Sequence, residues 1–296
     1  LFSFVPKNSA CALFLDLTEQ NLRMPAVQEQ LENLVREHDN GLLRKNNLKI
    51  KDVCSSFVIS MPSLMESDGY VIAKTALAEK RFKDLLQKSI TPEIKYSVAK
   101  SNGRNVYQIS FLTTKVSGGQ TKVKVRNFAL AYLAPDIVVI TKDSIAPYFK
   151  EPRGLTPNML KLLKVPNAFA SGFAITDSAF LLENPFLPPS RLNHFSAVFG
   201  RNEDIALRSE FQTASQEDAN QTMLVLQQYI LLAGLFLNNE NPALMQELTK
   251  SLKINRNGLN VTVNGNLSKE FFDILGNSAA NVQARLAQKK QPRVQQ

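Results

Sequence analysis

Two aspartates end two similar apolar runs, ALFLDLT at 12–18 and GFAITDS at 172–178. If a twofold axis related the two halves of the chain, Asp16 and Asp177 would approach each other. Two carboxylates in contact cannot easily both ionise, so they would share a proton and activate a water, as in aspartic peptidases. Those enzymes carry Gly after the Asp-Ser/Thr pair, whereas the triplets here are Asp-Leu-Thr and Asp-Ser-Ala. The alternative, which we favour, is that both aspartates cap the helices that follow.

Basic residues are the second candidate for chemistry. In TKVKVRN, Lys122, Lys124 and Arg126 alternate with valines, and the two-residue period of a strand places the three cations on one face with the valines beneath. A second basic cluster comprises Arg44, Lys45, Lys49 and Lys51. With a formal net charge of +9, these clusters favour an anionic polymer as partner, and the alternative is a solvated surface. Nucleic acid is possible but not favoured, because aromatic side chains for base stacking are missing near 122–126.

The cysteines leave two options open. Cys11 and Cys54 both lie in strand-like runs, where they would either form one disulfide in an oxidising compartment or act as small buried hydrophobes. Together with only two histidines they are too few for a structural zinc site, so no metal is expected. The chain also lacks nucleophile-elbow, H-E-x-x-H, P-loop and dinucleotide-binding motifs. We therefore expect no cofactor, and enzymatic activity stays uncertain, with a non-enzymatic role favoured.

Short strands and amphipathic helices must position these residues. Apolar alternation and tight-turn signals predict an antiparallel arrangement, with a type I′ turn at Asn102-Gly103. Thr156-Pro157 is a good helix start for 157–164, and Ser215 with Asp218 resembles a capping box. The main predicted strands are 10–17, 53–62, 69–76 and 168–176, and the main predicted helices are 24–38, 78–90 and 219–239.

The segment 219–239 is apolar and free of charge, but Gln227 and Gln228 fall at its centre. We interpret it as a buried core helix, because a membrane span would leave these amides to find partners in lipid. No uninterrupted apolar run of about 18 residues exists elsewhere, so no transmembrane span is predicted.

A proline-rich joint divides the chain. Residues 152–166 hold three prolines and a short helix, and they separate a first half at 1–151 from a second half at 167–276, followed by a basic, Gln-rich tail at 277–296. The expected fold class is α+β, with two similar halves, each a mostly antiparallel sheet covered by helices on one face. Whether the two sheets join into a larger assembly is left open.

The closing stretch of the second half, VTVNGNLSKEFFDIL at 261–275, matches DIVVITKDSIAPYF at 136–149 in its order of strand and helix. This layout resembles exported bacterial proteins of unassigned function that are built from two α+β repeats. The resemblance implies a periplasmic or secreted location, and the start at Leu1 without an initiator Met leads us to expect that a leader has been removed. It favours a non-enzymatic exported protein that binds an unidentified protein partner or organises the cell envelope. The alternatives are a secreted hydrolase, such as an aspartic-type peptidase acting on extracellular glycoprotein, and a binder of anionic polymer, glycan or nucleic acid.

Overall fold

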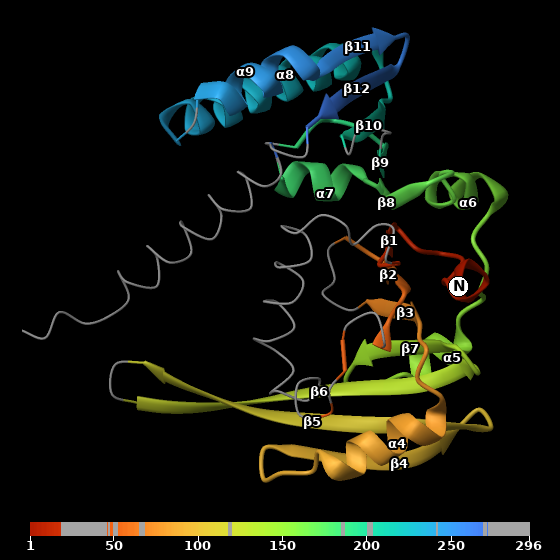
Figure 1. The fold of residues 1–296 in the computed structure, drawn as a ribbon. Helices are drawn as coiled ribbons and strands as arrows, with labels where there is room; N and C mark the ends of the chain where they lie inside the picture. Colours follow the sequence, from red (N-terminus) through yellow and green to blue (C-terminus); the bar gives the residue numbers. More distant parts are fainter. Residues whose placement is uncertain are drawn as a thin grey trace, which may run out of the picture.

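A single antiparallel sheet of twelve strands dominates the described part of the protein (Figure 1). The computed structural model describes residues 1–18, 46, 48–49, 53–64, 69–117, 120–184, 187–199, 204–240, 242–268 and 271. The strands follow the order β11-β12-β10-β9-β8-β1-β2-β3-β7-β6-β5-β4. Their bounds are β1 Cys11–Asp16, β2 Ser56–Met61, β3 Tyr70–Lys74, β4 Ile94–Ser101, β5 Arg104–Ser117, β6 Gln120–Ala134, β7 Ile137–Lys142, β8 Ala168–Ile175, β9 Leu192–Phe199, β10 Ile205–Gln212, β11 Lys253–Asn257 and β12 Asn260–Leu267.

The predicted fold of two sheets, each covered by helices on one face, is wrong. The first strand of each half pairs with its counterpart, because β1 and β8 run antiparallel with Cys11 opposite Ala174 and Leu15 opposite Ala170. Both strands are apolar, and an unpaired edge would leave their backbone groups without partners. Pairing these two edges merges the halves into one sheet.

Helices cover both faces of this sheet, not one. Their bounds are η1 Phe2–Phe4, α4 Glu79–Lys88, α5 Ala146–Lys150, α6 Pro157–Leu163, α7 Ser178–Glu183, α8 Gln216–Glu240 and α9 Pro242–Ser251. On one face, here called the α6 face, the N-terminal segment, α5 and α6 pack on buried residues such as Val58, Ile72 and Val139. On the opposite α8 face, Leu86 of α4 packs near β3 and β7, and Leu248 of α9 packs near β12.

Two predicted helix starts are confirmed. Thr156 caps α6 by accepting a hydrogen bond from the Met159 amide, with Pro157 in the first turn. The Ser215 hydroxyl accepts a hydrogen bond from the Asp218 amide, 3.0 Å away, at the start of α8. The interpretation of α8 as a buried core helix is wrong, because Leu224, Leu231 and Leu232 are at least half exposed. Among the described helices, none combines the length and hydropathy that a bilayer span requires.

The strand order is similar on either side of the β1–β8 pair. It reads β1-β2-β3-β7-β6 in one direction and β8-β9-β10-β12-β11 in the other. The third strand is followed by α4 in the first half and by α8 and α9 in the second. This arrangement agrees with a duplicated unit, while the duplication itself stays a prediction. The domain bounds drawn from the sequence also stay predictions, and the predicted tail at 277–296 lies outside the described residues.

Strands β5 and β6 run beyond their neighbours as a two-stranded ribbon (Figure 1). The pairing of β4 with β5 ends at Ile94–Phe111, and the pairing of β6 with β7 ends at Phe128–Lys142. Apart from two flanking backbone hydrogen bonds, from the Leu112 amide to the Glu93 carbonyl oxygen and from the Asp143 amide to the Asn127 carbonyl oxygen, residues 112–117 and 120–127 pair only within the β5–β6 ladder among the described residues. We call residues 112–127 the basic ribbon.

Candidate functional site

The two aspartates of the predicted peptidase dyad are not brought together. Asp16 ends β1, whereas Asp177 follows the end of β8, and the two strands are antiparallel neighbours. The ends of antiparallel strands point in opposite directions, so about eight residues of strand, roughly 26 Å, separate the two carboxylates. The dyad is therefore wrong. Each carboxylate instead accepts a backbone hydrogen bond: Asp16 from the Thr18 amide at 3.0 Å and Asp177 from the Phe180 amide at 2.7 Å.

The two cysteines also lie apart. In the β1–β2 pair, Cys11 is opposite Met61 and Asp16 is opposite Ser56, so Cys54 lies beyond the other end of the pair. Both thiols are free, and the disulfide between them is not formed. Burial raises the pKa of the Cys11 thiol and raises that of Cys54 to about 11. Neither side chain therefore has the thiolate character that reactive cysteines require at neutral pH.

The predicted cations of TKVKVRN occupy alternate positions of β6, in the basic ribbon. The register places Lys122 opposite Lys115, Lys124 opposite Thr113 and Arg126 opposite Phe111. Directly opposite residues share a face of the sheet, so all four cations of the ribbon belong to the same face. The segment 112–127 contains no acidic residue.

The expectation that the valines lie buried beneath these cations is wrong for Val125, whose side chain is 54% exposed. Val125 is opposite Leu112 in the β5–β6 pair, and both residues lie beyond the ends of the neighbouring strands β4 and β7. The register therefore places the cations on one face of the ribbon and Leu112 and Val125 on the other. Of the second predicted cluster, Lys49 is exposed, while Arg44, Lys45 and Lys51 lie outside the described residues.

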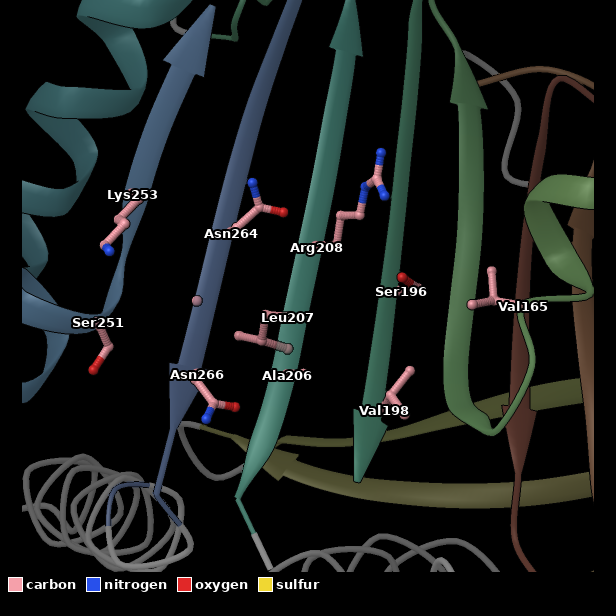
Figure 2. A pocket seen from close by; sticks show the side chains of 11 residues that line it. Val165, Ser196, Val198, Ala206, Leu207, Arg208, Ser251, Lys253, Asn264 and Asn266 are labelled. Atoms are coloured by element: carbon pink, nitrogen blue, oxygen red, sulfur yellow. The ribbon is translucent and has the colours of Figure 1, made fainter. Parts of the chain in front are cut away.

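A pocket that the sequence did not predict opens on the α6 face, near the β11 edge of the sheet (Figure 2). Its volume is about 530 Å³. One row of directly opposite residues crosses it, namely Lys253 of β11, Asn264 of β12, Arg208 of β10 and Ser196 of β9. The neighbouring row supplies Asn266, Ala206 and Val198, and Val165 closes one side. We call this depression the Arg208 pocket.

The same row explains why the pocket lies where it does. Beyond Ser196 it continues through Ser171, Phe14, Val58 and Ile72, which enter the core under α5 and α6. The helical cover ends near Val165, two residues after α6. The α6 face is therefore apolar and covered in the first half, and polar and open in the second.

The two cations of the pocket, Arg208 and Lys253, have different surroundings. Arg208 lies 3.5 Å from the Glu210 carboxylate in an exposed ion pair, an arrangement that contributes little to stability. Lys253 is exposed and has no ion-pair partner within the described residues. Asn266 donates a hydrogen bond to the Asp204 carboxylate. Glu210 and Asp204 are the acids beside this surface, and Glu210 is the one that contacts a pocket cation.

His194 lies on the same face as Arg208, opposite Glu210, and its Nε2 atom is 3.1 Å from the Leu162 carbonyl oxygen. Burial lowers its pKa, and the Leu162 and Glu210 oxygens offset part of that effect. A histidine whose folded pKa lies below the unfolded value of 6.5 stabilises the fold above that pH and loses this contribution as the pH falls.

We expect the loss of stability between about pH 7 and pH 5 to be smaller in His194→Gln than in the wild type. Urea unfolding at pH 7 and at pH 5 measures the free energy of unfolding of both proteins. An equal loss of stability in His194→Gln and in the wild type would contradict this prediction.

No described residues form a cluster of three or more His, Cys, Asp or Glu side chains suited to a metal ion. The sequence signal that could have revealed the Arg208 pocket lies in β12, where Asn260, Thr262, Asn264 and Asn266 alternate with apolar positions. A covered strand would carry apolar residues on both faces, so these four polar residues indicate an open face.

Comparisons with known proteins add a fold but no activity. No protein-family profile matches the chain, and no curated protein sequence matches it. A solved structure, described as crystal form I of TP0453, is similar with a TM-score of 0.52 and 9% sequence identity. The match covers 93% of this chain and 96% of that one. At this identity the likeness concerns the fold alone.

Proposed function

We propose that this protein is a non-enzymatic binding protein whose basic ribbon holds an anionic glycan. The observation that carries the proposal is the register of β5 and β6, which places Lys115, Lys122, Lys124 and Arg126 on one face. The hydrolase alternative no longer has a candidate catalytic pair, because Asp16 and Asp177 lie at opposite ends of their strand pair.

The register also suggests why the ribbon would need an anionic partner. Lys115 is directly opposite Lys122, and like charges in that position destabilise a strand pair. Within 112–127 no carboxylate offsets them. A polyanion lying along this face would neutralise the repulsion and release counterions, so binding is expected to weaken as salt rises.

A glycan is favoured over nucleic acid as the ligand. The aromatic rings at the base of the ribbon, Phe111 and Phe128, pack edge to face with centroids 5.9 Å apart, so they are engaged with each other. This contact reduces the aromatic surface open to bases there, whereas sulfate and carboxylate groups need only the cations. An exported location, proposed from the sequence, would place the protein among such glycans. Fractionation of cells that produce the full-length protein tests that location.

Charge reversal in the ribbon tests the proposed function. We expect Lys122→Glu/Lys124→Glu to weaken binding to heparin by at least about tenfold, which is about 1.4 kcal/mol. The double variant Lys80→Glu/Lys83→Glu changes the net charge equally on the exposed surface of α4 and serves as the control. Affinity is measured over a range of salt concentrations, with duplex DNA as a second ligand. Equal losses in both double variants would refute a role for the ribbon, and tighter binding to DNA than to heparin would refute the choice of glycan.

A further inference from the structure

We propose that the Arg208 pocket is a second, separate binding site, which takes a small ligand carrying one compact oxyanion, a carboxylate or a phosphate. The pocket is built by β9, β10, β11 and β12, whereas the basic ribbon is built by β5 and β6 near the opposite edge of the sheet. The two sites share no residue, so either can bind without the other.

The spacing of the two cations suits one oxyanion between them. Arg208 and Lys253 are each directly opposite Asn264, on the two strands that flank β12. Adjacent strands are about 4.8 Å apart, so the two backbones are about 10 Å apart. In the structure Arg208 leans toward β9 and away from Asn264 (Figure 2), and both side chains are long enough to turn toward a group held above Asn264. The Arg208 guanidinium would donate paired hydrogen bonds, Lys253 would add a point charge, and the Asn264 amide would donate from below.

A hydroxyl group on the floor of the pocket is placed to contact a ligand. Ser196 is only 6% exposed, and it lies opposite Arg208 on the pocket side of β9 (Figure 2). Its neighbour in the row, Ser171, donates a hydrogen bond to the Leu163 carbonyl oxygen at 2.7 Å, but Ser196 has no such partner among the described residues. The Ser196 oxygen is open to the pocket, so its hydroxyl is available for a hydrogen bond to a ligand. An oxyanion of a ligand would accept that hydrogen bond.

The size and the walls of the pocket indicate what else the ligand carries. A volume of about 530 Å³ falls within the range of small-molecule sites. Val165, Val198 and Ala206 line one side, and the amide of Asn266 lies on the other. A ligand with a short aliphatic part and one or two hydroxyl groups would therefore match these surfaces better than a flat aromatic ring.

Glu210 would compete with a bound anion for the Arg208 side chain. Its carboxylate already holds the Arg208 side chain at 3.5 Å, so an incoming anion must share or displace it. Removal of the negative charge at position 210 should therefore strengthen anion binding. A variant that binds more tightly cannot be explained by misfolding.

The experiment is a titration of isotope-labelled protein with inorganic phosphate and, separately, with acetate, at constant ionic strength. We expect saturable shifts of the backbone amide signals of Ser196, Arg208 and Asn264. Arg208→Gln and Lys253→Gln should each weaken binding by about tenfold, as loss of a charge-assisted hydrogen bond does. Lys250→Gln, in α9 and three residues from Lys253, loses the same charge outside the pocket and should bind like the wild type. Glu210→Gln should bind several-fold more tightly.

Each outcome has a defined meaning. Saturation by phosphate alone assigns a phosphate-bearing ligand, and saturation by acetate as well assigns any compact oxyanion. Failure of both anions to saturate these signals would overturn the proposal, as would equal affinity in Arg208→Gln and the wild type, or weaker binding by Glu210→Gln. Lys122→Glu/Lys124→Glu should keep the phosphate response, which separates a failure of this pocket from a failure of the basic ribbon.

Discussion

Gly172→Ala is expected to lower the free energy of unfolding by about 2–3 kcal/mol. Gly172 lies in β8 opposite Leu13 of β1, at the point where the two halves of the sheet join. A methyl group there would lie 2.8 Å from the Ala12 carbonyl oxygen and 2.6 Å from Phe195 Cε1. The ring can rotate away, but the carbonyl belongs to the neighbouring strand. The strands must therefore separate, which weakens the pairing that merges the two halves.

Thermal or urea unfolding of the whole chain measures this loss, and a decrease of roughly 5 °C or more in the midpoint is expected. Gly234→Ala is the matched control. Gly234 lies in α8, and its added methyl would meet Met245 at 3.4 Å, an ordinary contact. Ala is about 1 kcal/mol better than Gly inside a helix, so the same substitution should be stabilising there. If Gly172→Ala were as stable as the wild type, β1 and β8 would not pair at this distance.

Local features of the fold were predictable from the sequence because they depend on neighbouring residues. Asn102 and Gly103 have φ angles of 50° and 74°, the left-handed pair that a type I′ turn requires. The Thr156-Pro157 start of α6 is equally local, since a side-chain oxygen three residues from an amide is enough to cap it. For the same reason, most predicted strands lie within a few residues of those observed.

The single sheet was not predictable in this way. Its decisive contact joins residues 11–15 to residues 170–174, and the backbone hydrogen bonds of that contact carry no residue signature. The sequence favours two apolar strands but does not specify which edge each one meets. The dyad of Asp16 and Asp177 failed for a related reason. A twofold relation between antiparallel neighbours sends the ends of equivalent strands apart, whereas the hypothesis required them to meet.

The Arg208 pocket shows the same dependence on register. Its polar row takes one residue from each of four strands, Ser196, Arg208, Lys253 and Asn264, which are scattered over 69 positions of the sequence. None of the four belongs to a motif. In contrast, the basic residues of β6 recur at every second position of one short segment and were identified, although Lys115 became evident as their neighbour only through the β5–β6 register.

Tyr148→Ala is expected to be the most destabilising single substitution considered for this protein, at about 4 kcal/mol. Tyr148 lies in α5 and is fully buried on the α6 face. Its ring packs edge to face on Tyr70 of β3, with centroids 5.1 Å apart, and the Arg153 guanidinium lies 5.6 Å from the ring centroid. Its hydroxyl donates a hydrogen bond to the Phe4 carbonyl oxygen at 2.6 Å. One side chain thus connects the sheet, α5 and the N-terminal segment.

Tyr148→Phe separates the contribution of the hydroxyl from that of the ring. It keeps the ring contacts and leaves the Phe4 carbonyl without its donor, so a loss of about 1–2 kcal/mol is expected. Leu231→Ala, the control, removes an aliphatic side chain at a position that is 59% exposed, and it should change stability by less than about 0.5 kcal/mol. Urea unfolding gives all three values, and limited proteolysis reports whether the N-terminal segment detaches first. If the hydroxyl anchors that segment, Tyr148→Phe should speed cleavage near Phe4 by more than its loss of global stability accounts for. Equal cleavage rates in Tyr148→Phe and the wild type would mean that packing of the ring, and not the hydrogen bond, holds the N-terminal segment on the sheet.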